Sequence, residues 1–171
     1  MPSPKYSLLE NERRFLVIAP PDLTGARVRL IEDRYLSCGR LRLRRITHFD
    51  GHLPEFKLCK KYGSDDPFSE PITNIYLSEA EHAALSALAA HPLRKRRHTV
   101  RWGERGFSVD VFEGPLTGLV TCEAEAESPE AIRARAFPPW AAREVTTDPR
   151  FSGAHLATLA AEDLAAQLAL A

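Results

Sequence analysis

The feature that most constrains the fold of this sequence is a set of segments in which every second residue is charged. Segment 40–44 carries arginine at alternate positions, and segment 123–127 carries glutamate at alternate positions. Segment 95–101 repeats the spacing with mainly basic side chains, and segment 10–14 repeats it with acidic and basic ones. Because successive side chains of a β-strand point to opposite faces, each segment predicts a strand with one charged face.

These charged faces allow two interpretations. A charged face on one strand is usually the solvated side of an open sheet, where water screens the repulsion between like charges. Four such strands in one chain favour a barrel or tunnel lined with charge, with helices packed outside it. We therefore predict an α+β fold that is mainly antiparallel β.

Local patterns give the expected elements. Alternation and turn signals predict strands at 9–18, 28–37, 40–49, 55–62, 94–102, 107–112 and 118–127. Ser78 and Glu81 have the spacing of a capping box, which predicts a helix over 78–91 with Leu85 and Leu88 packed inward. A short helix is expected over 129–135, and an Ala- and Leu-rich helix over 154–171.

Length and composition exclude several classes of protein. A chain of 171 residues that is 44% hydrophobic and 27% charged is typical of one globular domain, here residues 1–171. No apolar run is long enough to cross a bilayer and residues 1–9 hold no apolar signal region, so we expect a cytoplasmic protein with no membrane partner. The three cysteines have no CxxC spacing, which predicts reduced core residues without a disulfide or zinc site.

The charges are balanced in number but not in position. The 23 basic and 23 acidic residues argue against a nucleic-acid partner. Basic residues predominate in 1–105, however, and acidic residues predominate in 106–171. A fold that joins the two parts would place cations and carboxylates in one cavity. The six histidines show no metal-ligand spacing and are expected on the surface or in loops.

Several motifs, in this order along the chain, resemble the CYTH superfamily, also called triphosphate tunnel metalloenzymes. The resemblance spans residues 8–156. An N-terminal box of the form ExExK is matched by Glu10, Glu12 and Arg14, with arginine in place of lysine. The other matching motifs are Arg42-Leu43-Arg44, Lys95-Arg96-Arg97, Val109-Asp110-x-Phe112, Glu123-Ala124-Glu125, Pro138-Pro139-Trp140 and Asp148-Pro149-Arg150-Phe151.

The resemblance implies an eight-stranded antiparallel tunnel that forms the core at 8–156. It also implies that the tunnel binds a triphosphate through basic side chains and binds Mg²⁺ or Mn²⁺ through glutamates. Two acid pairs match the catalytic and metal positions: Glu10 with Glu12, and Glu123 with Glu125. Carboxylates two residues apart on a strand point the same way, so each pair could form a hard oxygen site.

The same resemblance gives the expected substrate contacts. They are Arg14, Arg42, Arg44, Lys57, Lys61, Lys95 and Arg97. Arg14 is still a cation, but arginine cannot donate a proton at neutral pH, so an acid role of the family lysine does not transfer to it. Lys60 and Lys61 could instead be solvated. Many members carry a further Glu-x-Glu strand where this chain has only Glu70, which favours one metal ion over two.

The resemblance favours a metal-dependent hydrolase of triphosphate groups, with inorganic triphosphate as the first substrate to test. Thiamine-triphosphatase and class IV adenylate cyclase are other activities of the family. A non-catalytic module that binds polyphosphate or a nucleotide is the alternative from another class. Either a monomer or a homodimer is compatible with the sequence.

Overall fold

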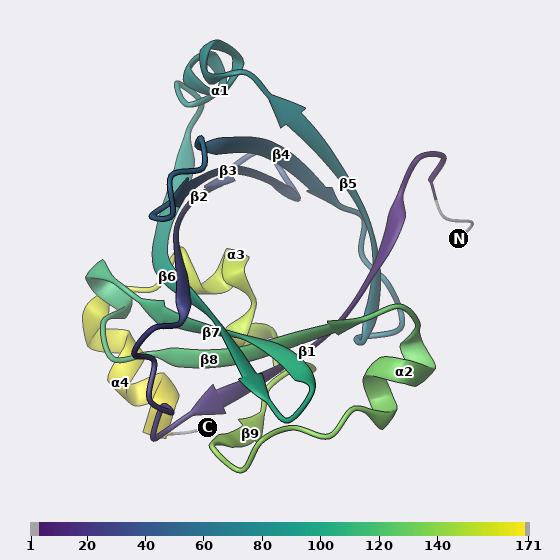
Figure 1. The fold of residues 1–171 in the computed structure, drawn as a ribbon. Helices are drawn as coiled ribbons and strands as arrows, with labels where there is room; N and C mark the ends of the chain where they lie inside the picture. Colours follow the sequence, from purple (N-terminus) through teal and green to yellow (C-terminus); the bar gives the residue numbers. More distant parts are fainter. Residues whose placement is uncertain (1–3, 170–171) are drawn as a thin grey trace.

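A computed structural model of the chain describes residues 4–169 (Figure 1). Nine strands are present: β1 (Leu8–Val17), β2 (Arg27–Leu36), β3 (Leu41–His48), β4 (Glu55–Lys61), β5 (Ser69–Leu77), β6 (Ala90–Trp102), β7 (Arg105–Phe112), β8 (Val120–Ala126) and β9 (Ala141–Glu144). The helices are α1 (Glu79–Leu85), α2 (Pro129–Ala134), α3 (Gly153–Leu156) and α4 (Ala161–Ala169). None of these helices is long and apolar enough to cross a membrane.

The strands form a closed antiparallel barrel, which confirms the predicted fold. Their order is β5-β4-β3-β2-β6-β7-β8-β1-β9, and a further pairing of β5 with β1 closes eight of them into a ring. β1 makes the closure possible because its first residues pair with β5, while its later residues pair with β8 and β9. Figure 1 shows the ring around an open interior, which we call the lumen.

The charged faces of the strands line the lumen, while alternate apolar residues pack outside. Phe15, Phe107 and Cys122 belong to an external core that also includes Ile132 of α2. Phe15 and Phe137 stack with ring centroids 4.0 Å apart, which fixes the chain that follows α2 against the barrel. On this side of the barrel the apolar core therefore lies outside the strands and the charged side chains lie inside.

The lumen is apolar at one end, and the C-terminal segment covers that end. Leu16, Leu93 and Phe112 each lie two residues beyond a charged lumen residue, so they share its face. They form a core with Phe151, Leu156 and Leu164 of the C-terminal segment. Burial of these apolar side chains is what holds α3 and α4 at this end.

Several boundaries differ from the sequence predictions. The helix expected over 78–91 ends at Leu85, and β6 begins at Ala90. It buries no side chain completely, and Leu88 is 45% exposed, so the expected inward packing of Leu88 is wrong. The capping box between Ser78 and Glu81 is confirmed. The capping box defines the start of the helix but not its length, because residues 90–91 pair with β2 as part of a strand.

The C-terminal helix expected over 154–171 is two helices, with a break at 157–160. Residues 170–171 of that prediction lie outside the described residues. Strands β5 and β9 have no clear alternation in sequence and are formed by pairing with β1 and, for β5, with β4. The three cysteines are free, as expected, but Cys38 is exposed and is not a core residue.

Candidate active site

The two predicted acid pairs lie side by side on neighbouring strands. β1 and β8 pair in a register that sets Glu12 opposite Glu125 and Arg14 opposite Glu123. Directly paired residues of an antiparallel sheet project on the same side, so these side chains meet in the lumen. The register brings Glu12, Glu123 and Glu125 together, and Glu10 lies on the same face of β1, two residues before Glu12.

Arg14 is bound to the acids themselves. Its guanidinium donates to Glu12 at 2.9 Å and to Glu123 at 2.7 Å, and its third hydrogen bond goes to the carbonyl of Phe151 at 3.1 Å. These bonds join the acid pairs to the segment that covers the end of the barrel. A substrate contact by Arg14, expected from the sequence, would have to compete with them.

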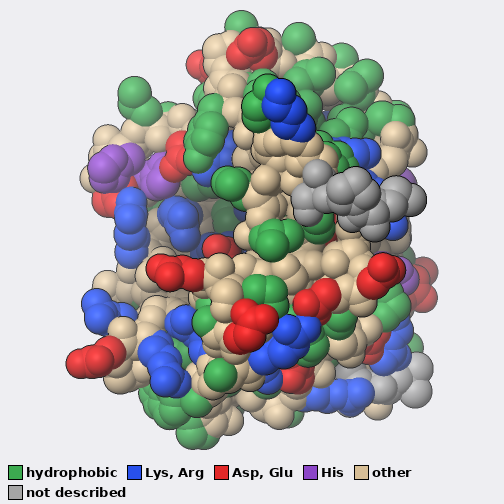
Figure 2. All heavy atoms as spheres, turned by 90° about the vertical axis from the view of Figure 1, so that its right-hand side faces the viewer, with side chains coloured by type: hydrophobic (Ala, Val, Ile, Leu, Met, Phe, Trp, Pro, Cys, Tyr) green, Lys and Arg blue, Asp and Glu red, His purple; other side chains and the backbone are tan. Residues whose placement is uncertain are grey.

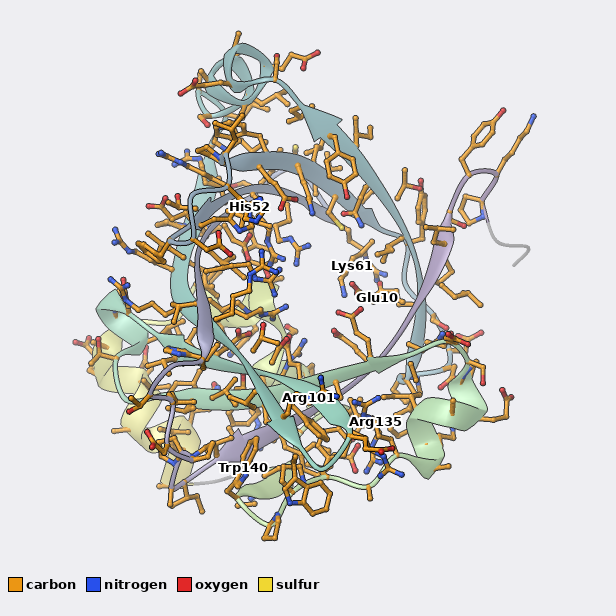
Figure 3. All side chains as sticks on the ribbon, viewed as in Figure 1. Glu10, His52, Lys61, Arg101, Arg135 and Trp140 are labelled. Atoms are coloured by element: carbon orange, nitrogen blue, oxygen red, sulfur yellow. The ribbon has the colours of Figure 1, made fainter. Side chains whose placement is uncertain are left out.

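Lys61 occupies the space between the acids of β1 and β5. Its ammonium lies 2.7 Å from Glu10, 3.4 Å from Glu70 and 3.9 Å from Glu12. Figure 3 shows Glu10 and Lys61 pointing toward each other inside the barrel. Burial would raise the pKa of Glu10, but the charge and hydrogen bond of Lys61 outweigh burial and the pKa is lowered. Lys60, the next residue back along the strand, pairs with Leu41 on the outer face.

A buried aspartate that the sequence analysis did not single out holds two predicted arginines. Asp33 on β2 accepts two hydrogen bonds from Arg44, at 2.6 and 2.7 Å, and lies 3.8 Å from Arg42. Burial would raise the pKa of Asp33, but the arginines outweigh it and lower the pKa to about 2. A sequence signal does exist: Asp33 lies between Ile31 and Tyr35 at every second position of β2, so an acid stands on a face that is otherwise apolar or aromatic there.

A second aspartate holds the two predicted basic residues of β6. Asp110 on β7 accepts hydrogen bonds from Lys95 and from Nε and Nη2 of Arg97. Arg97 also donates to Glu123, which is therefore held between two arginines. Burial would raise the pKa of Glu123, but the surrounding cations hold it well below its usual range. Glu123 is therefore ionised, and the two arginines already balance its negative charge.

Glu125 differs from the other lumen carboxylates. Within residues 4–169 its carboxylate has no hydrogen bond or ion pair to a basic group, and the side chain is exposed at the open part of the lumen. Partial desolvation and the nearby charges of Glu10 and Glu12 raise the pKa of Glu125. An additional cation placed beside Glu125 would relieve this repulsion.

The open part of the lumen contains a cavity of about 260 Å³. Its lining includes Arg29, Thr99, Ser108, Glu123 and Glu125. A larger cleft of about 930 Å³ lies between the start of β1 and the β4–β5 connection, and Glu70 is the one lumen residue discussed above that contributes to it. Figure 2 shows a hollow on one side of the molecule with basic side chains inside it. The charged residues that line the smaller cavity are Arg29, Glu123 and Glu125.

The donor set suits a hard divalent cation that also binds its substrate. No three His, Cys, Asp or Glu side chains are arranged as a ready metal site in the part of the chain that the structure describes. Mg²⁺ does not need such a cage, because it is commonly held by one or two carboxylates together with water and substrate phosphates. Glu125, opposite Glu12 and near Glu10, has the oxygen chemistry and the uncompensated charge for this role.

No protein-family model and no curated protein matches the sequence. Among solved structures, two of the protein NE1496 are similar. One, described as an inorganic triphosphatase, has a TM-score of 0.59 and 27% identity over 88% of this chain and 95% of that chain. The other, described as a hypothetical protein, has a TM-score of 0.60 and 26% identity over 88% of this chain and 99% of that chain.

The fold is the one that the resemblance to the CYTH superfamily predicts. The match covers nearly the whole of NE1496. Five of the seven motifs in this chain fall on strands that line the same lumen, and those at 138–140 and 148–151 lie outside the strands. The protein PH1819 of Pyrococcus horikoshii OT3 is similar in fold, with a TM-score of 0.54 and 17% identity over 72% of this chain and 82% of that chain.

Proposed function

We propose that this protein is a metal-dependent triphosphatase that cleaves the terminal phosphoanhydride of a triphosphate inside the lumen. Inorganic triphosphate is the proposed first substrate. The observation that carries the proposal is the unbalanced Glu125 beside Glu10 and Glu12, in a lumen whose other walls are basic. The similarity to a structure described as an inorganic triphosphatase supports the same reaction class.

The basic side chains of the lumen would bind and orient the substrate. Arg42 and Arg44 come from one wall, and Lys95 and Arg97 come from the neighbouring wall. Their aspartate partners hold the side chains in place, so little side-chain freedom is lost when phosphate oxygens bind. Guanidinium forks suit bidentate contacts to phosphate, and Lys57 and Lys61 add charge on the β4 side.

Glu10, Glu12 and Glu125, with Glu123 next to them, would hold the divalent cation. When bound, Mg²⁺ or Mn²⁺ would neutralise phosphoryl oxygens and lower the pKa of a coordinated water. Water attacks the terminal phosphorus and the bridging P–O bond breaks, so inorganic triphosphate yields orthophosphate and diphosphate. The covered end of the lumen limits access of other water to the bound phosphates.

A binding module without catalysis is the second candidate, and one observation favours it. Glu123 is bonded to both Arg14 and Arg97, so one of the four family glutamates is already neutralised by the protein. Carboxylates repel phosphate, however, and a module that binds only anions gains nothing from Glu125. We therefore place catalysis first.

Glu125→Gln tests the proposal. The substitution keeps the shape of the side chain but removes the charge, so phosphate release from inorganic triphosphate should fall by about 100-fold or more. The concentration of Mg²⁺ or Mn²⁺ that gives half of the maximal rate should rise. Glu104→Gln in the exposed β6–β7 turn is the matched control and should behave as the unsubstituted protein. Equal rates and equal metal requirement in Glu125→Gln would contradict the assignment.

Thiamine triphosphate and ATP belong in the same assay, to test the other family activities.

A further inference from the structure

Arg29 is a lumen cation that neither the motifs nor the predicted contacts include. It lies on β2, and the β2–β6 register sets it directly opposite Arg97. Each of the predicted substrate contacts has an acidic partner, and even Lys57 lies 2.8 Å from Glu55. Among residues 4–169, Arg29 makes no ion pair and no side-chain hydrogen bond.

The environment of Arg29 is unfavourable without an anion. Like charges directly opposite each other on neighbouring strands destabilise a sheet. The Nε atom of Arg29 is buried and has no hydrogen-bond partner, which leaves its desolvation uncompensated. Burial, and then the charges of Arg97 and Arg27, lower the pKa of Arg29. The nearby acids Glu55 and Asp110 offset this only in part, because Glu55 binds Lys57 and Asp110 binds Arg97.

The same cavity contains the opposite imbalance. Arg29 and Glu125 both line the 260 Å³ space, together with the hydroxyl-bearing Thr99 and Ser108. The cavity thus has a cation without an acid on one wall and an acid without a cation on the other. A phosphoryl group that carries a divalent cation supplies both missing partners, since its oxygens suit Arg29 and its cation suits Glu125.

We propose that Arg29 is a substrate-binding residue, and that it binds a phosphoryl group of the triphosphate next to the cation held at Glu125. The inference rests on the proposed function and deepens it. It assigns the metal-bound phosphate to the β2–β6–β8 side of the lumen, away from Lys61.

The test measures binding of sodium tripolyphosphate, without metal by calorimetry and by thermal melting, and then phosphate release with Mg²⁺. Arg29→Gln removes the charge, and Arg29→Lys keeps the charge but loses the planar fork. Arg45→Gln is the matched control, because Arg45 is an exposed arginine of β3 whose side chain points outside the barrel. Loss of one charge-assisted contact predicts binding weaker by about 10- to 100-fold for Arg29→Gln, with a smaller loss for Arg29→Lys.

A second readout separates ligand binding from folding. Without ligand, Arg29→Gln should melt at the same temperature as the unsubstituted protein or higher, because the repulsion with Arg97 is gone. The rise in melting temperature caused by tripolyphosphate should nevertheless be smaller than in Arg45→Gln. Binding by Arg29→Gln equal to that of the control would overturn the inference, even if hydrolysis by the unsubstituted protein supports the proposed function. Weaker binding by Arg29→Gln would support the inference, even if no phosphate is released.

Discussion

At the scale of single residues, two buried aspartates organise the basic side of the lumen. Asp33 and Asp110 have side chains that are 1% and 0% exposed, and each is shared between two basic residues. A buried ion pair adds little net stability over an apolar pair, but removal of one partner leaves a buried charge uncompensated. The aspartates therefore allow these basic side chains to stay buried in the folded protein when no ligand is bound.

Asp33→Asn should be strongly destabilising for this reason. The substitution leaves Arg44 and Arg42 without their carboxylate, and the free energy of unfolding should fall by about 3–5 kcal/mol. Urea denaturation measures the change, with Asp65→Asn in the exposed β4–β5 connection as the control. Tripolyphosphate should restore part of the stability, because it supplies an anion to the same arginines. A loss no larger than that of the control would show that Asp33 does not neutralise the arginines.

The lowered pKa of Asp33 also predicts the direction of acid unfolding. Its pKa is about 2 in the folded state against 3.8 for an ordinary aspartate, so the folded state favours the ionised form. This contribution is fully present above about pH 4 and is lost as the pH falls through the folded pKa near 2, with a size of about 2 kcal/mol. Urea titrations between pH 5 and 2 should show this loss, and Asp33→Asn should lack it. Parallel curves for the two proteins would contradict the predicted ionisation.

At the scale of elements, the C-terminal segment is part of the tunnel. Arg14 of β1 donates to the carbonyl of Phe151, and Gly153 at the start of α3 lies against the ring of Tyr35. A Cβ at Gly153 would overlap the Tyr35 hydroxyl, so a larger residue would require Tyr35 or α3 to shift. Tyr35 packs against the core of the covered end, which limits how far its ring can move.

Gly153→Ala tests this packing. The added methyl group must displace Tyr35 or α3, which should lower the free energy of unfolding by about 1–3 kcal/mol. Gly106→Ala is the control, because no heavy atom lies within 4 Å of the position of its Cβ. In a double-mutant cycle with Tyr35→Phe the two losses should be less than additive, since the hydroxyl is the nearest atom. Additive losses would show that α3 and Tyr35 do not contact each other in this way.

The elements differ in how well the sequence predicts them. The charged strands were predictable because alternation is a local signal that both faces of a barrel strand must satisfy. The end of α1 was not, because Pro92 reads as a helix terminator, whereas in the structure it pairs with Arg34 inside β6. The break between α3 and α4 was not predictable either, since it follows from the fit of this segment over the apolar end of the lumen.

At the scale of the whole molecule, the sequence predicted which side chains share the lumen but not how they pair. Alternation and the family resemblance together placed Glu10 and Glu125 inside, and they left Lys61 either inside or solvated. The pairing of Arg14 with Glu123 depends on the β1–β8 register, and that of Asp33 with Arg44 depends on the β2–β3 register. Registers of distant strands are set by closure of the barrel, so no local pattern reveals them. Arg29 was missed because its role depends on Arg97 across the strand.

The central claim is that the charged lumen performs metal-dependent hydrolysis. The most direct measurement follows orthophosphate release by the unsubstituted protein from inorganic triphosphate, first without metal and then after addition of Mg²⁺ or Mn²⁺. Calorimetry without metal shows whether the triphosphate is already bound. The proposed mechanism predicts binding before metal is added and release only afterwards, because the cation is needed to activate water. Tight binding with no release under either ion, from neutral to alkaline pH, would contradict the enzyme assignment and leave a polyphosphate-binding module.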